Sequence, residues 1–144
     1  MLILLRGLPG AGKSSLASSF ADAHVVSADS FFTSPAGEYN FNPSLLPQAH
    51  SWCQEQARSL LALGANVVVA NTFSQRWEME PYFKIAAGLG VRVTVADLFD
   101  AGLDDEELAE RGLHGVSLET IAAMRSRWEH NWREGDPRAP WERG

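Results

Sequence analysis

Short runs of apolar residues recur along the chain, and longer stretches with helical spacing of apolar and polar positions separate them. The runs cover residues 2–5, 24–28, 67–70 and 91–98. Their shortness and nearly continuous apolar character favour strands buried on both faces, as in a parallel sheet, over helices. Polar or glycine-containing segments follow the runs, where strands are expected to end.

The stretches between these runs carry the end signals of helices. We expect helices over residues 15–22, 45–63 and 77–89, a further helix that opens at 104–107, and a last helix capped by Ser117. Gly64 and Gly90 end the second and third of these. Strands that alternate with helices predict an α/β protein with a parallel sheet between helical layers. Ligands of such sheets bind at the carboxyl ends of the strands.

Two segments do not fit this alternation. Residues 30–44 contain two prolines, a glycine and two asparagines, so we expect a long loop, and loops of this length usually have a function. The end of the chain is polar, but Trp132 and Trp141 indicate that part of it packs. We therefore expect one domain over residues 1–130 and a partly packed tail over residues 131–144.

The composition is that of a globular protein. Of the 144 residues, 45% are hydrophobic, which is too many for a disordered chain. No apolar run is long enough to cross a bilayer, and the apolar start is far shorter than the core of a signal peptide. Cys53 is the only cysteine, so no internal disulfide can form and a reducing compartment is indicated. We expect a soluble cytoplasmic protein that does not bind a membrane.

The net charge of −6, with His neutral, argues against a protein coated in positive charge for non-specific DNA binding. A local basic groove is still compatible with this total. The last third of the chain is polarised, with acids at 104–110 and arginines from Arg111 to Arg143. Lysine occurs only at Lys13 and Lys84.

The segment from Gly7 to Ser14 reads G-x-x-x-x-G-K-S, the pattern of a phosphate-binding loop between a strand and a helix. Glycines allow a turn that points backbone N–H groups at an anion, and the helix start adds partial positive charge. In this pattern Lys13 reaches the β- and γ-phosphates, and the Ser14 hydroxyl binds Mg²⁺. The sequence predicts that ATP with Mg²⁺ contacts Pro9, Gly10, Ala11, Gly12, Lys13, Ser14 and Ser15.

Asp29 follows the second predicted strand, so it is expected at the same sheet edge as the phosphate-binding loop. Its carboxylate can accept the proton of a hydroxyl that attacks the γ-phosphate, or it can hold a Mg²⁺-bound water. The simpler alternative is a turn former after a strand. Ser27 and Ser30 flank Asp29 and can orient it or contact the substrate.

Other polar and aromatic residues are expected near Asp29. Asn71 and Thr72, at the end of the third strand, can contact the γ-phosphate or the attacking group, or can simply form a turn. Nearby aromatic side chains can stack on a base or pack in the core. These are Phe31, Phe32, Tyr39, Phe41 and Trp52, and the first two adjoin Asp29.

Several segments occur in an order that resembles one protein family. Besides the phosphate-binding loop they are residues 26–32, 39–43, 49–52, 71–72, 77–82 and 108–117. Together they are similar to the polynucleotide-kinase-type branch of the P-loop kinases, and especially to small kinase-like domains of the NEDD4-binding protein 2 type. The resemblance extends to about residue 128, and the segment from His114 to Ser117 is the part most specific to this branch.

The resemblance implies a P-loop NTPase with an adenylate-kinase-like, three-layer α/β/α fold, a four-stranded parallel core sheet and a helical lid at about residues 100–117. It implies a kinase that moves the γ-phosphate of ATP to a hydroxyl of a nucleic acid or a nucleotide. Asp29 matches the general base of the family, and Arg111 matches a lid arginine that contacts the nucleotide phosphates. Arg125, on the following helix, is a second candidate for the nucleotide.

Some positions depart from the family pattern. Residues 30–33 lack the arginine that holds a substrate phosphate, Asn71 stands near a usual aspartate, and Phe73 replaces an asparagine. A second lid arginine is replaced near His114 or Gly115. A kinase of hydroxymethylated pyrimidines in DNA or of a small metabolite is therefore an alternative. A module whose ATP binding and hydrolysis switch a partner, without kinase activity, is another.

Overall fold

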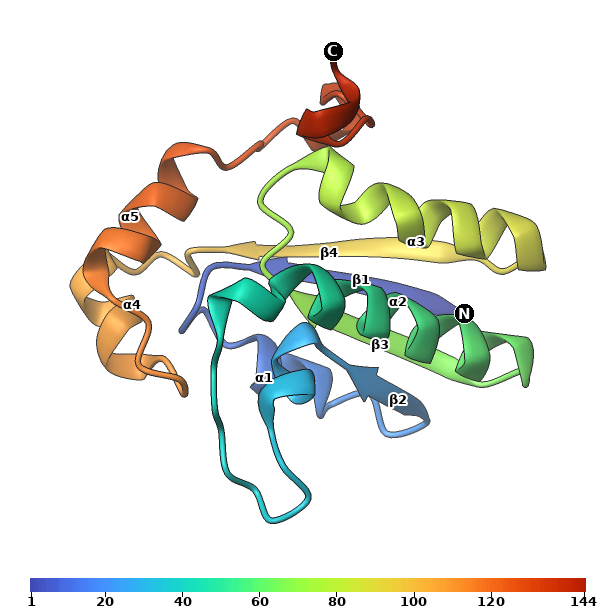
Figure 1. Cartoon of the computed structure of the whole chain (residues 1–144), viewed down its shortest axis with the longest axis horizontal. Coiled ribbons are helices and arrows are strands. Elements are labelled where there is room, and N and C mark those ends of the chain that lie inside the picture. Colours follow the sequence, from blue (N-terminus) through green and yellow to red (C-terminus); the bar gives the residue numbers. More distant parts are fainter.

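A single sheet of parallel strands, in the order β2-β3-β1-β4, organises the computed structural model, which describes residues 1–144 (Figure 1). The strands are β1 (Leu2–Gly7), β2 (Ala23–Val26), β3 (Asn66–Asn71) and β4 (Val93–Phe99). β1 is central, and its residues from Leu2 to Arg6 pair with β3 on one side and β4 on the other. The predicted four-stranded parallel sheet is thus confirmed.

Helices cover both faces of the sheet and its carboxyl edge. They are α1 (Lys13–Ala17), α2 (Leu46–Ala62), α3 (Arg76–Leu89), α4 (Asp105–Arg111) and α5 (Leu118–Ser126). α2 and α3 pack on one face and form the main core with it. α1 packs on the opposite face, so this third layer is thin. α4 and α5 lie beyond the carboxyl ends of the strands (Figure 1), where their apolar residues pack on the loop after β1.

The first helix ends earlier than its sequence predicts. The predicted helix covers residues 15–22, whereas α1 ends at Ala17. The hydroxyl of Ser18 donates to the carbonyls of Ser14 and Ser15, and that of Ser19 donates to the carbonyl of Leu16. Serine side chains that bond to helix carbonyls offer the backbone an alternative to further helical turns.

The second strand also ends early, at Val26 rather than at residue 28. Residues Ala28–Phe32 form a short 3-10 helix, η1, because the Ala28 N–H donates to the side chain of Asn71 (2.9 Å) instead of to the sheet. The predicted loop over 30–44 therefore begins inside η1. It also contains an antiparallel bridge between Thr33 and Tyr39 and a second 3-10 turn, η2 (Pro43–Leu45).

The last third of the chain keeps its predicted helix caps. Asp104 forms a capping box with Glu107 at the start of α4, and Ser117 accepts the Thr120 N–H (3.2 Å) at the start of α5. The final helix is shorter than predicted, since α5 ends at Ser126 and Trp128 lies beyond it. Trp128 is nevertheless buried, and it packs in the cluster formed by α4, α5 and the loop after β1.

The segment after α5 runs back over α3, where the end of the chain lies in Figure 1. Trp132 stacks on Phe83 with ring centroids 5.7 Å apart. Trp141 meets the edge of Trp77 at 5.4 Å and is 76% exposed. The tail is therefore attached to the domain mainly through Trp132.

Arg6, in the central strand, is completely buried. Its guanidinium donates to the carbonyls of Phe73 (2.9 Å), Ser74 (3.0 Å) and Glu129 (2.9 Å), and it pairs with Asp97 at 3.1 Å. It also lies over the ring of Trp128, 4.1 Å from its centroid. One side chain thus connects β1, β4, the loop after β3 and the segment after α5.

The thiol of Cys53 is free and buried in the main core. None of the helices has both the length and the hydropathy that a membrane span requires.

Candidate active site

The loop after β1 has the backbone shape of a phosphate cradle. Gly10 and Gly12 adopt φ angles of +83° and +99°, in the left-handed region that favours glycine. A Cβ atom on Gly10 would collide with the backbone carbonyl of Leu108 in α4. The loop therefore needs glycine at this position both for its conformation and for its close packing against α4.

Backbone N–H groups in this loop are free to bind an anion. Those of Gly10, Gly12, Lys13, Ser14 and Ser15 donate to no acceptor in the protein. Such successive unpaired N–H groups in a glycine-rich turn are the structural basis of phosphate binding. Two residues predicted to contact the nucleotide differ from these: Pro9 has no N–H, and the Ala11 N–H donates to the Leu8 carbonyl (3.1 Å). Pro9 and Ala11 therefore shape the loop.

Two side chains of the loop have the exposure expected for nucleotide and metal ligands. The Ser14 hydroxyl is exposed and makes no hydrogen bond within the protein, so it is available to a Mg²⁺ ion. The Lys13 ammonium donates to the carbonyls of Gly7 (2.6 Å) and Leu8 (3.1 Å). Burial lowers the pKa of Lys13 to about 8, and the charge of Asp29 opposes part of this shift. Asp29 and Lys13 therefore interact across the site.

This lowered pKa leads to a testable proton linkage. At a pH of about 8, roughly half of the Lys13 side chains are uncharged in the free protein. A bound triphosphate favours the charged form, so Mg²⁺–ATP binding at this pH should take up about half a proton, and affinity should fall as the pH rises further. Calorimetry in two buffers of different ionisation enthalpy measures this uptake. Lys13→Met should abolish it, and buffer-independent heats for the unmodified protein would contradict this expectation.

Asp29 lies in the first turn of η1, and its side chain is 56% exposed. The Tyr39 hydroxyl donates to Asp29 Oδ1 through a long hydrogen bond of 3.4 Å. His114 Nε2 lies 3.7 Å from Asp29 Oδ2. Burial, followed by the charge of Asp29, raises the pKa of Tyr39 to about 12, so this phenol stays protonated at physiological pH and remains a donor.

His114 is the residue of this site that sequence reasoning does not assign. Its ring stacks on that of Tyr39, with centroids 4.0 Å apart and planes 21° from parallel. His114 belongs to the loop between α4 and α5, whereas Tyr39 belongs to the long loop before α2. The stack therefore connects the loop between α4 and α5 to the long loop that follows Asp29 and η1.

The other residues expected near Asp29 have different environments. Ser27 and Ser30 bond to each other through their hydroxyls (3.2 Å). Phe31 is half-buried, with its ring between those of Phe32 and Trp52. Phe32 is only 6% exposed and belongs to the main core, so little of its ring is free to stack on a base.

At the end of β3, Asn71 holds η1 in place. It is 8% exposed, its Oδ1 accepts the Ala28 N–H (2.9 Å), and its Nδ2 donates to the Cys53 sulfur (3.7 Å). Both polar atoms thus have a partner inside the protein, and the contact with substrate stays a prediction. Thr72 is half-buried at the strand end, and its carbonyl accepts the Gly7 N–H (3.2 Å). Its hydroxyl makes no hydrogen bond within the protein.

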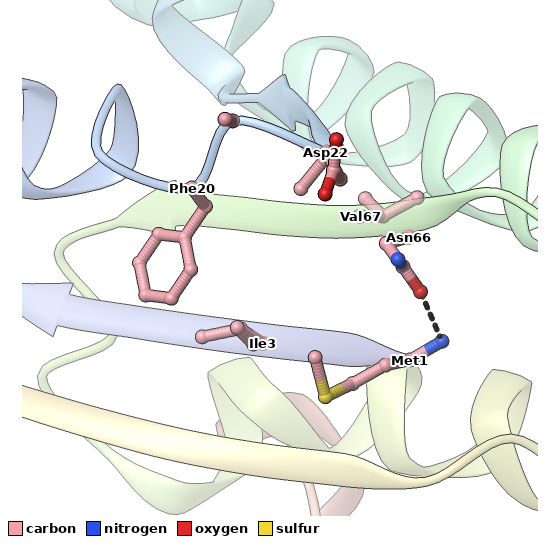
Figure 2. A pocket seen from close by; sticks show the side chains of 8 residues that line it. Met1, Ile3, Phe20, Asp22, Asn66 and Val67 are labelled. Atoms are coloured by element: carbon pink, nitrogen blue, oxygen red, sulfur yellow. Dashed lines mark hydrogen bonds between the residues drawn. The ribbon is translucent and has the colours of Figure 1, made fainter.

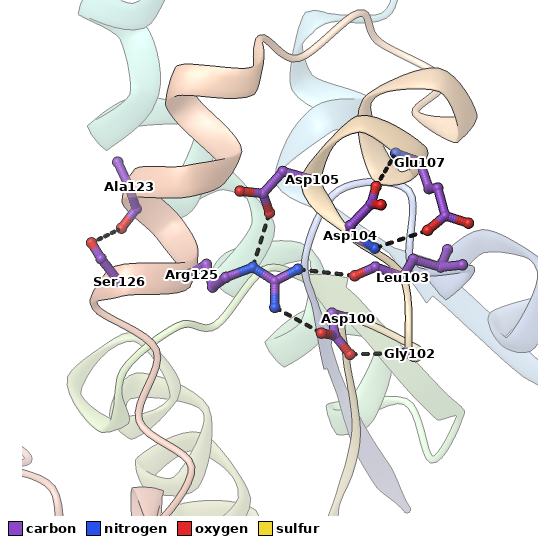
Figure 3. A network of polar contacts seen from close by, with 9 residues as sticks. All are labelled: Asp100, Gly102, Leu103, Asp104, Asp105, Glu107, Ala123, Arg125 and Ser126. Carbon is purple, nitrogen blue, oxygen red and sulfur yellow. Dashed lines mark hydrogen bonds and ion pairs between the residues drawn. The ribbon is translucent and has the colours of Figure 1, made fainter.

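The two arginines assigned to the nucleotide differ in how they are bonded. Arg111, the last residue of α4, is exposed and makes no ion pair or side-chain hydrogen bond. Arg125 pairs with Asp100 (2.7 Å) and Asp105 (2.9 Å) and donates to the Leu103 carbonyl (3.0 Å), as Figure 3 shows. These bonds raise the pKa of Arg125. Arg125 thus braces α5 against the start of α4, and its predicted role at the nucleotide is not supported.

A hollow of about 250 Å³ lies elsewhere, at the amino ends of β1 and β3. Figure 2 shows Phe20 and Ile3 at one side of it and the Met1 amino group bonded to Asn66 (3.1 Å) at the other. Ligands of parallel sheets bind at the carboxyl ends of the strands. This hollow is therefore at the opposite end from the phosphate-binding loop.

Sequence comparisons identify relatives of the whole domain. A family model described as an AAA domain matches residues 2–130. Human NEDD4-binding protein 2 is 35% identical over an alignment of 130 residues that covers 86% of this chain and 7% of that protein. The chain thus spans a small part of this relative.

Solved structures agree on the fold. A chain of the Pnkp1/Rnl/Hen1 RNA repair complex superposes with a TM-score of 0.71 at 20% identity, over 96% of this chain and 48% of that one. A gluconokinase from Sinorhizobium meliloti 1021 superposes with a TM-score of 0.58 at 20% identity, over 96% and 77% of the two chains. These likenesses establish an α/β P-loop fold of the kind found in kinases.

Proposed function

Because the chain belongs to the AAA domain family of P-loop proteins, we propose that it binds ATP with Mg²⁺ and transfers the γ-phosphate to a hydroxyl of a nucleic acid or a nucleotide. The observation that carries this proposal is that Asp29 lies just beyond the carboxyl end of β2, at the same edge of the parallel sheet as the unpaired N–H groups after β1, and that its charge acts on the Lys13 ammonium. Phosphoryl transfer to a hydroxyl requires three groups at one site: a carboxylate, a lysine and an anion-binding loop.

Each residue of the site has one role in this proposal. The free N–H groups of Gly10, Gly12, Lys13, Ser14 and Ser15 hold the phosphates. Lys13 neutralises charge that develops on them. Ser14 holds Mg²⁺, which when bound supplies further neutralisation of the phosphates. Asp29 accepts the proton of the attacking hydroxyl.

Residues 100–117 act as the lid in this proposal, with Arg111 closing over the nucleotide. Arg111 supports this role because its guanidinium is exposed and free of ion pairs. Lid closure excludes water that would otherwise hydrolyse ATP. The free buried thiol of Cys53 is compatible with the reducing cytoplasm that we propose as its compartment.

The first test of the function is nucleotide binding by Lys13→Met. Loss of charged hydrogen bonds to phosphate should weaken Mg²⁺–ATP binding by roughly 10- to 100-fold, as measured by calorimetry. Lys84→Met is a matched control, because Lys84 is the only other lysine and lies exposed on α3. Equal affinities for Lys13→Met and Lys84→Met would remove the basis of the proposed function.

The second test is transfer of labelled γ-phosphate to a panel of acceptors. The panel contains 5′-hydroxyl DNA, 5′-hydroxyl RNA, hydroxymethyluracil in DNA, nucleosides, nucleotides and gluconate. Label on a nucleic acid, nucleoside or nucleotide is the expected result. Hydrolysis of ATP without label on any acceptor would instead favour the switch module.

A further inference from the structure

The wall of the site that carries Asp29 has no lysine or arginine. Neither residue occurs between Ser14 and Ala57, a stretch that includes η1, the loop with Tyr39 and the first half of α2. Proteins usually hold a substrate phosphate with arginine or lysine. In the proposed function Lys13 and Arg111 belong to the nucleotide, and this wall itself offers no permanent cation to a phosphate of the acceptor.

Aromatic and apolar side chains line this wall instead. The Phe41 ring is almost parallel to that of Tyr39, 9° from it with centroids 6.4 Å apart, and Phe41 is 50% exposed. Leu113, next to His114, is 78% exposed. Exposed apolar residues that gather at one place indicate a binding surface more often than isolated ones do.

Tyr39 and His114 face each other as two nearly parallel plates with their polar tips at Asp29. The Tyr39 hydroxyl meets Asp29 Oδ1, and His114 Nε2 lies near Oδ2. A planar group that enters between the rings therefore has its edge beside the Asp29 carboxylate. Entry requires the rings to separate by roughly 3.5 Å, the thickness of one more plate.

The loop that carries His114 can move away from Tyr39 because it is loosely packed around Gly115. It consists of residues 112–117, between α4 and α5, and Gly115 adopts a φ of +63°. A Cβ atom on Gly115 would meet nothing within 4 Å, so the loop is not packed there. Residues 113–115 are exposed, whereas Val116 packs on the cluster of α4 and α5. Movement of residues 113–115 therefore changes few buried contacts, and such segments open at low free-energy cost.

We propose that Tyr39 and His114 clamp the planar base of the acceptor, and that no phosphate of the acceptor is paired with the protein. This inference rests on the proposed function. The acceptor hydroxyl gives its proton to Asp29 and forms a bond to the γ-phosphorus. The bond from that phosphorus to the β,γ-bridging oxygen breaks, and ADP leaves with the bonding electrons. The base belongs either to a free nucleoside or to the terminal nucleoside of an oligonucleotide.

The test is steady-state transfer from saturating Mg²⁺–ATP to thymidine, a 5′-hydroxyl thymidine trinucleotide, 5-hydroxymethyl-2′-deoxyuridine and glycerol. Loss of one stacking partner costs about 5- to 100-fold in affinity, so Tyr39→Leu and His114→Ala should each raise the acceptor KM about tenfold. The KM for ATP should stay unchanged. Tyr39→Phe keeps the ring and should keep the acceptor KM within about threefold. His24→Ala, an exposed histidine on β2, is the matched control.

Salt provides an independent measurement. Because no acceptor phosphate is paired, the KM for the trinucleotide should change less than about twofold between roughly 50 and 200 mM KCl. The two nucleoside-bearing sources are distinguished by whether thymidine or the trinucleotide has the higher kcat/KM. His114 lies in the loop between α4 and α5 and outside the buried core, so His114→Ala should keep the fold. The KM of His114→Ala therefore tests the clamp even if Tyr39→Leu loses stability in a thermal melt.

Several results would overturn the clamp. Asp29-dependent transfer with an acceptor KM that neither Tyr39→Leu nor His114→Ala changes by more than about twofold would refute it and leave the proposed function standing. A steep rise of the trinucleotide KM with salt would do the same. Preference for glycerol would refute the clamp and would also contradict a nucleic-acid or nucleotide acceptor. Lack of transfer to every probe would count against the proposed function itself, and the clamp would be rejected with it.

Discussion

Asp29→Asn is expected to lower the rate of phosphoryl transfer by roughly 10²- to 10⁴-fold, the contribution of a positioned general base. Asparagine has nearly the same shape and still accepts the bond from Tyr39 that Asp29 Oδ1 receives at 3.4 Å. It cannot take a proton from the acceptor. Because Asp29 is 56% exposed, the substitution leaves no buried charge unpaired, and the fold should keep its thermal midpoint.

A loss of kcat with unchanged nucleotide binding distinguishes a general base from a residue that binds ATP. Asp29→Asn should bind Mg²⁺–ATP within about threefold of the unmodified protein in calorimetry, since the phosphates contact the loop after β1. Glu38→Gln removes an exposed carboxylate from the same long loop and should leave kcat unchanged. Transfer by Asp29→Asn at the rate of Glu38→Gln would show that Asp29 is not the base.

The same variant separates the two roles that the sequence leaves open for Asp29. A general base affects kcat at every Mg²⁺ concentration. A carboxylate that holds a Mg²⁺-bound water would instead raise the Mg²⁺ concentration needed for half-maximal transfer. A magnesium titration of Asp29→Asn, run beside that of Glu38→Gln, therefore tells which role operates.

The sheet and most helices follow from local pattern. Val67, Val68 and Val69 are nearly or completely buried in β3, so burial acts on every position and leaves a continuous apolar run that is easily recognised. Gly90 ends α3 in the left-handed conformation, with a φ of 66°, as its place after an apolar stretch predicts. The residues that define these elements are close together in the sequence, so a local pattern is enough to predict them.

The details around Asp29 could not be predicted in this way. Asn71 occupies the end of a strand whether its side chain points at a ligand or at the Ala28 N–H, and only the packed structure distinguishes the two. Phe32 is likewise aromatic in either role, and its burial depends on α2. The stack of Tyr39 on His114 joins residues far apart in the sequence, so no local sequence pattern predicts it.

Arg6 was open to prediction from one signal, a charged residue that directly follows an apolar run expected to be buried. Burial favours such a residue only when acceptors surround it. The structure supplies the carbonyls of Phe73, Ser74 and Glu129. Phe73 has a φ of 49°, a left-handed conformation that costs about 1–3 kcal/mol and persists only where other contacts hold it.

Arg6→Met is therefore expected to lower the free energy of unfolding by about 3–5 kcal/mol. Methionine fills similar space but leaves the carbonyls of Phe73 and Glu129 without a donor, whereas the Ser74 carbonyl keeps the Glu129 N–H (2.8 Å). Each orphaned acceptor costs about 1–3 kcal/mol when water does not replace the donor. Asp97 is 34% exposed, so water can solvate its carboxylate and it adds little to this cost. The expected fall in the thermal midpoint is roughly 10–20 °C.

Chemical denaturation of Arg6→Met, Asp97→Asn and Arg92→Met separates these contributions. Asp97→Asn keeps an acceptor for Arg6 and should cost about 1 kcal/mol or less. Arg92→Met removes an exposed arginine beside β4 and should change stability by no more than about 0.5 kcal/mol. If Arg6→Met unfolded at the denaturant concentration of Arg92→Met, the buried guanidinium would not be what holds β1, the loop after β3 and the segment after α5 together. Because Gly7 follows Arg6 directly and begins the phosphate-binding loop, Arg6→Met should also weaken ATP binding well below its own unfolding transition.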